Sequence, residues 1–238
     1  MKEEETDINS KRRAPVINIA HRGYGRDFPE NTLEAFKAAL ELGSDGIEFD
    51  VQETADGEFF IFHNDEIEGT KIADMRAADI REVRIQGKYV IPPLEEALAK
   101  CVAAMILIVE LKQVQSLEKF LAILRSHINV ARVIIVSFDH ELISRLAVLA
   151  PDIMRAVITN APVDRPAEIT KAVGSAAIGL RCQDVNAESV SRLHRDGTMV
   201  FVWGCPDARS VRAVMKFDID GVISDFPDAV KEGNADRD

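Results

Sequence analysis

Residues 105–149 read MILIVELKQVQSLEKFLAILRSHINVARVIIVSFDHELISRLAVL, and this stretch decides the fold. Short β-branched runs at 105–111 and 133–138 are each followed by an amphipathic stretch, at 117–127 and 141–149. A short apolar run followed by helical periodicity is typical of a parallel sheet whose faces are covered by helices. The stretch therefore predicts repeated strand–helix units.

The same alternation extends along the chain in both directions. Further strands are expected at 16–20, 154–158, 176–180, 199–203 and 221–224, and further helices at 33–42, 167–173, 187–194 and 208–215. No linker interrupts this pattern, whereas residues 1–15 lack apolar periodicity. We therefore expect a disordered N-terminal tail over residues 1–15 and a single domain over residues 16–238.

Two more apolar runs, at 46–51 and 58–63, bring the expected strands to nine. A closed α/β barrel has eight parallel strands, so one of the nine must differ. Asp56-Gly57 is a hairpin signal, which makes 58–63 antiparallel to 46–51 and places His63 near Asp50. An open doubly wound sheet also fits nine strands, but no G-x-G-x-x-G follows the first strand. We predict a barrel with a small insertion after the third strand.

Composition excludes several classes of partner. The chain has 238 residues, with 29 basic against 40 acidic ones, and this net charge of −11 repels nucleic acids and anionic membranes. Three cysteines without a C-x-x-C pair favour a reducing compartment, and no apolar run is long enough to span a bilayer. Residues 1–13 are charged throughout, so we expect a cytoplasmic protein without stable membrane insertion. The oligomeric state stays open.

Three carboxylates fall at the ends of predicted strands. Glu48 and Asp50 stand two residues apart in the strand 46–51, so their side chains share one face. Inside a barrel they repel each other unless a cation compensates them, and hard divalent ions prefer oxygen ligands. Glu110 can complete a site for one divalent cation, Mg²⁺ or Ca²⁺, with Mn²⁺ as a further candidate. A solvent-facing strand with incidental acids is the alternative.

Lys112 follows Glu110 by two residues and therefore faces the same side of its strand. Its ammonium group can neutralise charge that develops on phosphoryl oxygens in a transition state. A simple buried ion pair between Lys112 and Glu110 explains the pattern equally well.

Two histidines end predicted strands. His21 follows the strand 16–20, and His63 follows a run of aromatic and aliphatic residues. A histidine titrates near neutral pH, and Arg22 beside His21 can hold a phosphate with two hydrogen bonds. Phosphodiester cleavage needs one group that accepts a proton and one that donates it, so His21 and His63 are the expected pair, with their roles unassigned. The other histidines lie in or beside predicted helices and are expected at the surface or in packing: His127, His140 and His194.

An ordered series of motifs covers nearly all of the chain after residue 15. In order, these are His21-Arg22-Gly23, Pro29-Glu30-Asn31-Thr32, residues 46–51, Asp56-Gly57 before His63, residues 91–96, Glu110-Leu111-Lys112, Ser137-Phe138, Trp203 and residues 220–227. The series resembles the glycerophosphodiester phosphodiesterase family. The resemblance implies a TIM barrel that hydrolyses glycerophosphodiesters to sn-glycerol 3-phosphate and an alcohol, with a divalent cation and two histidines.

The resemblance also implies roles for individual residues. The acid/base pair corresponds to His21 and His63, and the metal ligands correspond to Glu48, Asp50 and Glu110. The residues that bind substrate correspond to Arg22, Lys112 and Trp203. Glu30 and Asn31 resemble supporting residues, although an N-cap of the following helix would also explain Asn31 or Thr32.

The chain departs from the family pattern in three places. It has His63-Asn64-Asp65 where the family commonly has His-Asp, which leaves the histidine intact. It has Trp-Gly-Cys-Pro at 203–206 in place of Trp-Thr-Val-Asn, which alters the rim where the alcohol group is expected. The segment between His63 and Pro92 is short and lacks Arg-Thr-Thr, which predicts an accessible mouth and small water-soluble substrates.

Two other functions fit the same motifs. A phospholipase C-like or D-like enzyme acting on intact lipid would need an apolar or basic rim, for which Trp203, Tyr24 and Tyr89 offer little. A catalytically silent phosphate-binding barrel would be expected to lack a histidine or a carboxylate, and none is missing.

Overall fold

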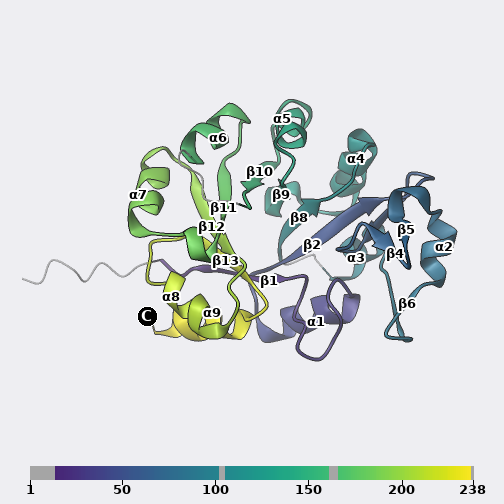
Figure 1. The fold of residues 1–238 in the computed structure, drawn as a ribbon, viewed down its shortest axis with the longest axis horizontal. Helices are drawn as coiled ribbons and strands as arrows, with labels where there is room; N and C mark the ends of the chain where they lie inside the picture. Colours follow the sequence, from purple (N-terminus) through teal and green to yellow (C-terminus); the bar gives the residue numbers. More distant parts are fainter. Residues whose placement is uncertain (1–13, 102–104, 161–165, 237–238) are drawn as a thin grey trace, which may run out of the picture.

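The computed structural model describes residues 14–101, 105–160 and 166–236, and its strands close into a barrel (Figure 1). The predicted tail over residues 1–15 lies outside the described residues except for Ala14 and Pro15. The nine strands of the main sheet are β1 Ile17–His21, β2 Gly46–Glu53, β3 Phe59–Ile61, β8 Ile106–Leu111, β9 Val133–Ser137, β10 Met154–Ile158, β11 Ala177–Arg181, β12 Met199–Trp203 and β13 Gly221–Ser224.

Eight of these strands are parallel and form a closed ring. The order is β1-β13-β12-β11-β10-β9-β8-β2, and an additional pairing between β1 and β2 closes it. The ninth strand, β3, pairs antiparallel with β2, with Val51 opposite Ile61. The predicted TIM barrel and the predicted hairpin are therefore both confirmed, and the open-sheet alternative is wrong.

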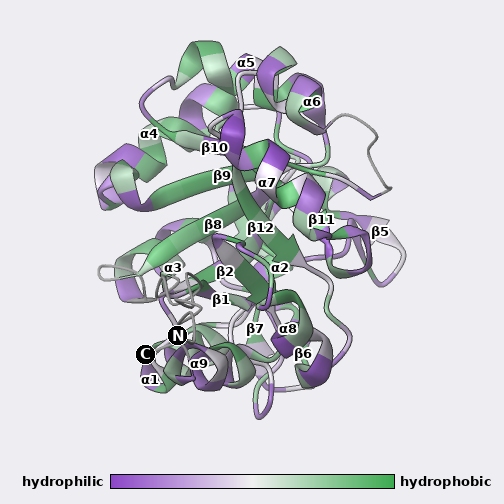
Figure 2. Cartoon of the chain, turned by 90° about the vertical axis from the view of Figure 1, so that its left-hand side faces the viewer, coloured by the Kyte–Doolittle hydropathy of each residue, from purple (hydrophilic) through white to green (hydrophobic). Residues whose placement is uncertain are grey.

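Helices surround the barrel on the outside (Figure 1). They are α1 Leu33–Leu42, α3 Leu94–Cys101, α4 Leu117–His127, α5 His140–Leu149, α6 Pro166–Ala172, α7 Ala187–Arg195, α8 Ala208–Val214 and α9 Pro227–Ala235, with short 3-10 turns η2 Val130–Arg132 and η3 Cys182–Asp184. Hydrophobic colour covers β8, β9 and β12, whereas the helices carry both polar and apolar surface (Figure 2). Helices with one apolar face against strands buried on both faces are what the alternating sequence pattern predicts.

Side chains alternate along each strand between two cores. Ile47, Phe49 and Val51 point outward into the large core beneath the helices, where Phe49 packs against Phe36 with ring centres 5.7 Å apart. A second, smaller core fills the barrel interior, with Ile19, Ile108, Phe201 and Ile223 among its members. Because Glu48 and Asp50 alternate with the outward-facing residues of β2, their side chains point into the barrel interior.

The predicted insertion after the third strand is a small packed unit. Its elements are β4 Glu66–Ile67, β5 Thr70–Lys71, η1 Ile72–Asp74, α2 Ala77–Glu82, β6 Arg84–Ile85 and β7 Tyr89–Val90. It has its own apolar cluster, which includes Phe60, Ile72, Ile80 and Ile91. This cluster is separate from the two barrel cores, and Phe60 of β3 connects the unit to the main sheet. No helix among the described residues has the length and apolar character to cross a membrane.

Candidate active site

A pocket of about 250 Å³ opens at the carboxyl ends of the barrel strands. The residues that line it are His21, Arg22, Glu48, His63, Ile108, Glu110, Ile134, Val136, Phe138, Ala156, Ile158, Asn160, Gly179, Phe201, Trp203 and Ile223. Its charged lining residues come from β1, β2, β8 and the turns that follow β1 and β3, and β9 to β12 supply an apolar wall. A barrel of this kind carries its active site at this end.

His21 ends β1, and the chain turns sharply directly after it. Arg22 and Gly23 both adopt positive φ angles, of 53° and 85°. A side chain on Gly23 would have its Cβ 2.7 Å from the backbone of Ala35, so glycine is required where α1 approaches the turn. The backbone N–H of Arg22 donates to Glu48 Oε2 at 3.1 Å. The turn thus fixes His21 beside the carboxylates of β2.

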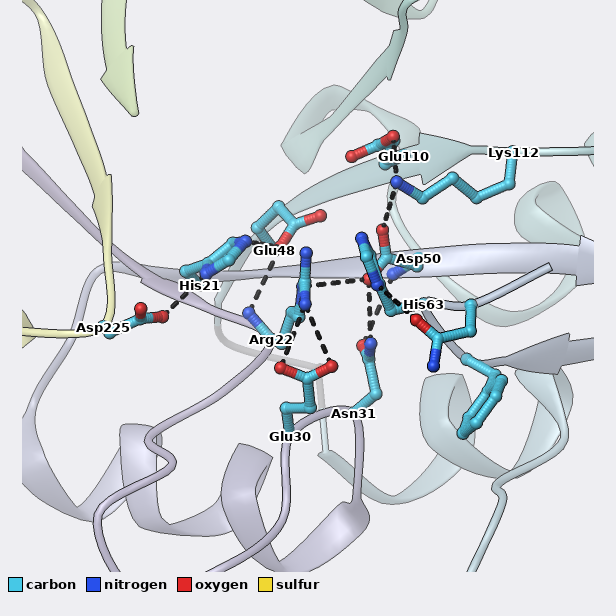
Figure 3. A network of polar contacts seen from close by, with 12 residues as sticks. His21, Arg22, Glu30, Asn31, Glu48, Asp50, His63, Glu110, Lys112 and Asp225 are labelled. Carbon is cyan, nitrogen blue, oxygen red and sulfur yellow. Dashed lines mark hydrogen bonds and ion pairs between the residues drawn. The ribbon is translucent and has the colours of Figure 1, made fainter. Parts of the chain in front are cut away.

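Glu48, Asp50 and Glu110 form a compact acidic cluster (Figure 3). One carboxylate oxygen from each residue lies within 4.8 Å of the others, and all three side chains are buried. Burial and the charge of Asp50 raise the pKa of Glu48 to about 8. The same two causes raise the pKa of Glu110. Burial opposes ionisation of Asp50 too, but Lys112 and Arg22 outweigh it, so the pKa of Asp50 is lowered.

The cluster fits a divalent cation. Glu48 Oε1 is buried and has no hydrogen-bond partner among the residues that the structure describes. Such an oxygen is costly unless a cation or donor meets it, and three converging carboxylates are the ligand set that Mg²⁺, Ca²⁺ and Mn²⁺ prefer. The predicted ligands therefore lie together in a suitable arrangement.

Arg22 and Lys112 both pair with these carboxylates. Arg22 donates to the two oxygens of Glu30 at 2.9 and 3.0 Å, and its Nε lies 3.2 Å from Asp50 Oδ2. Lys112 Nζ lies 3.0 Å from Asp50 Oδ1 and forms a close ion pair with Glu110. The alternative of a Glu110–Lys112 ion pair is therefore observed, and it exists together with the acidic cluster rather than replacing it.

Asn31 supports Asp50 directly. Its Nδ2 donates to Asp50 Oδ2 at 2.8 Å, while Asp50 has no exposed surface. The N-cap of α1 is Thr32, whose hydroxyl accepts from Ala35 N, so capping does not explain Asn31. Asn31 itself has a φ of 57°, a left-handed conformation that asparagine tolerates better than most residues. The residue predicted as supporting therefore holds a buried carboxylate in place.

His63 follows β3 and lines the same pocket as His21. Its Nδ1 lies 3.0 Å from the side-chain Oδ1 of Asn64. The side-chain amide of Gln52, on β2, donates to Phe62 O at 3.0 Å and also to Asn64 O, which ties this loop to the barrel. The hairpin therefore places His63 in the same pocket as Glu48 and Glu110.

The aromatic residues of the pocket lie on its apolar side. Trp203 stacks edge-on against Phe138 with ring centres 5.7 Å apart, and its Nε1 donates to Gly179 O at 3.3 Å. A Cβ on Gly179 would lie 3.4 Å from the Trp203 ring. Trp203, which the sequence analysis expects to bind substrate, therefore lines the pocket. Asn160 and the apolar lining residues were not predicted as site residues from the sequence.

Asp225 is a further residue of the site to which the sequence assigned no role. His21 Nδ1 lies 2.7 Å from Asp225 Oδ1. Burial lowers the pKa of His21, but the hydrogen bond to Asp225 and the charge of Glu48 outweigh it, so the pKa is raised. Asp225 directly follows the apolar strand β13, and a polar residue in that position is the same signal that identified the other site residues.

Comparison with known proteins agrees with this geometry. Residues 21–229 match the model of the Glycerophosphoryl diester phosphodiesterase family. A glycerophosphodiester phosphodiesterase from Bacillus altitudinis is 28% identical over 235 residues, covering 90% of this chain and 96% of that protein.

Solved structures extend the comparison. A glycerophosphodiester phosphodiesterase from Thermotoga maritima has a TM-score of 0.79 and 25% identity, covering 92% of this chain and 99% of that one. A phosphodiesterase from Oleispira antarctica, in complex with the product sn-glycerol-3-phosphate, has a TM-score of 0.83 and 24% identity, covering 93% and 96%.

Proposed function

Because the chain belongs to the glycerophosphoryl diester phosphodiesterase family, a family of hydrolases, we propose that it hydrolyses glycerophosphodiesters to sn-glycerol 3-phosphate and an alcohol. One observation carries the proposal: a single pocket brings two histidines to a buried cluster of three carboxylates. The product bound to the Oleispira antarctica relative is the one that this reaction releases.

In this proposal His21 and His63 are the acid/base pair. Both rings line the pocket, one at the end of β1 and the other after β3. A phosphodiester between them would have one ring beside its attacking oxygen and the other beside its leaving oxygen, which is what proton transfer in both directions needs.

The acidic cluster supplies the proposed cofactor site. Glu48, Asp50 and Glu110 would hold one divalent cation, Mg²⁺ or Ca²⁺, and the cation would add positive charge next to the phosphate oxygens. Arg22 lines the same pocket and is proposed to contact the phosphate, with Glu30 orienting its guanidinium group. Lys112, between Asp50 and Glu110, is proposed to add its charge to this side of the pocket.

A second candidate is hydrolysis of an intact lysophospholipid, a phospholipase D-like activity. The apolar wall formed by Val136, Ile158, Phe201 and Trp203 favours it, because such a wall accepts an apolar group better than a polyol.

A cytoplasmic location is also proposed, and the free thiols of Cys182 and Cys205 support it.

The test measures release of glycerol 3-phosphate from glycerophosphocholine, glycerophosphoethanolamine and glycerophosphoglycerol, and release of choline from lysophosphatidylcholine in a separate reaction. Each reaction is run with Mg²⁺, Ca²⁺ or Mn²⁺ and with a chelator. We expect cation-dependent release that His21→Ala abolishes and His127→Ala leaves intact, because His127 lies on the exposed face of α4, away from the pocket. A folded protein that releases glycerol 3-phosphate from none of the three glycerophosphodiesters would contradict the proposal, and choline release from lysophosphatidylcholine alone would support the second candidate.

A further inference from the structure

The two histidines of the pocket are held by different partners. His63 Nδ1 meets the amide oxygen of its sequence neighbour, Asn64, whereas His21 Nδ1 meets the carboxylate of Asp225, 204 residues away in sequence. A long-range carboxylate on one ring and a local amide on the other is an asymmetry that the proposed function does not explain.

Barrel closure determines where Asp225 lies. Strands β1 and β13 are parallel neighbours with Ala20 opposite Ser224 and Ile19 opposite Ile223. Extending this register by one residue places His21 beside Asp225. Ile19 and Ile223 both face the barrel interior, so the alternation of a strand turns the residues two positions later, His21 and Asp225, toward the same side.

We propose that Asp225 is the positioning residue of His21, and that its carboxylate fixes the ring with a proton on Nδ1 and with Nε2 turned toward the acidic cluster. The other end of the ring supports this orientation, since His21 Nε2 lies 3.9 Å from Glu48 Oε2 (Figure 3). An ionised carboxylate can only accept a hydrogen bond, so its neighbour in a neutral ring must be the nitrogen that carries the proton.

The segment that carries Asp225 is itself held in place. Phe226 N donates to the Ser224 hydroxyl at 2.9 Å, and Asn18 Nδ2 donates to Pro227 O at 2.9 Å. The first of these bonds closes the turn, and the second ties the start of α9 to β1. The carboxylate therefore has a rigid support on the same strand pair as His21.

Asp225 contributes little to the fold by itself. Its side chain is 66% exposed, and among the described residues it makes an ion pair with His21 and no other. The hydrogen bond from His21 holds the pKa of Asp225 below its usual range, so the carboxylate is ionised at neutral pH. An exposed ion pair stabilises a protein only weakly. Its replacement should therefore affect the orientation of His21 far more than the folded state.

The kinetic test of this proposal rests on the proposed function. It compares the wild type with Asp225→Asn, Asp225→Glu and the control Asp228→Asn. Asp228 belongs to the same segment, but it pairs with Arg26 at 2.6 Å instead of a pocket residue. We expect Asp225→Asn to lower kcat on glycerophosphocholine by about 10- to 100-fold with KM within about twofold. Asp225→Glu should recover part of the loss because it restores a carboxylate, and Asp228→Asn should match the wild type.

A second measurement does not depend on turnover. In protein labelled with ¹⁵N-histidine, the neutral His21 ring should carry its proton on Nδ1 in the wild type and in Asp228→Asn. It should shift toward the Nε2–H form in Asp225→Asn. An unchanged kcat in Asp225→Asn, or an unchanged tautomer, would overturn the proposal. A wild type without turnover on any diester would contradict the proposed function alone, and the tautomer would still decide the role of Asp225.

Discussion

The two sides of the pocket differ in almost every physical property. The side formed by β1, β2, β8 and the loop after β3 carries two histidines, an arginine and two of the three clustered carboxylates. Among the described residues, the wall formed by β9 to β12 contributes no charged side chain to the pocket. We therefore expect the charged side to carry the chemistry and the apolar wall to recognise the organic groups of the substrate.

The charged side is held together by mutual compensation. Buried carboxylates are unfavourable, and Asp50 is tolerated because Lys112, Arg22 and Asn31 all contact it. The apolar wall needs no such support, since its residues continue the packing of the barrel interior. Substitutions on the two sides should therefore have different effects on kcat, on KM and on stability.

The largest effect is expected from His63→Gln, on the charged side. Glutamine can keep a hydrogen bond but cannot exchange a proton near neutral pH, so kcat should fall by about 10²- to 10⁴-fold with KM little changed. Steady-state kinetics on glycerophosphocholine measures this effect. His194→Gln is the matched control, because His194 pairs with Asp220 outside the pocket. Equal losses in both variants would refute the role of His63.

The next effect concerns the pH dependence of stability without a cation. The pKa of Glu48 is raised from 4.5 to about 8, so the folded protein keeps a proton that the unfolded chain releases. The contribution of Glu48 to stability should be complete below about pH 4.5, and stability should fall by a few kcal/mol as the pH rises toward about 8. Glu110 acts in the same direction, whereas Asp50, with a lowered pKa, acts only below its ordinary value of 3.8.

Thermal unfolding in a chelator, from about pH 5 to about pH 9, measures this dependence. Glu48→Gln should flatten the curve, and Glu34→Gln, at an exposed position of α1, should not. A divalent cation should raise Tm more at the upper end of the range, because its ligands must lose their protons to bind it. Equal slopes in the wild type and Glu48→Gln would contradict the assignment.

A smaller effect, on the free energy of unfolding, is expected from substitutions of Asn31. Two variants distinguish the loss of its hydrogen bond to Asp50 from the strain of its positive φ angle. Asn31→Ala removes the hydrogen bond to buried Asp50 and also places alanine at a positive φ, and it should cost about 1–3 kcal/mol of unfolding free energy. Asn31→Gly removes the same hydrogen bond but tolerates the φ angle, so it should cost less. Chemical denaturation of both variants measures the two contributions. Identical losses would mean that backbone strain is negligible.

The smallest effect is expected on the apolar wall. Trp203→Leu should raise KM by about tenfold while kcat changes little, because the ring is proposed to contact the substrate and has no group that exchanges protons near neutral pH. Trp203→Phe keeps an aromatic ring and should retain most of the affinity. A loss in kcat as large as that of His63→Gln would break the division between the two sides of the pocket.

Much of the fold and of the charged side was predictable from the sequence because both follow from local patterns. Apolar runs followed by amphipathic stretches gave the strands, and the Asp56-Gly57 turn gave the antiparallel β3. The site residues stood out as polar groups at the ends of apolar strands. The β2–β8 register places Asp50 beside Glu110, and Glu48 lies two residues before Asp50 on the same face of β2.

The remainder depends on long-range geometry. The wall residues Val136, Ile158 and Phe201 have the same sequence pattern as any inward-facing strand residue, so nothing local distinguishes a pocket from a filled interior. Gly179 matters only because Trp203 lies against it, from the neighbouring strand. Asp225 has the local signal of a polar residue after an apolar strand, but its contact with His21 depends on the pairing of the first and last barrel strands.

That pairing also has a consequence for biosynthesis. His21, Glu48 and Glu110 all leave the ribosome in the first half of the chain, but β13 begins only at Gly221. Until β13 is made, β1 lacks one of its two neighbours and the ring of strands cannot close. Contacts so distant in sequence form slowly. Closure of the barrel, and with it the contact between His21 and Asp225, can therefore form only after β13 has left the ribosome.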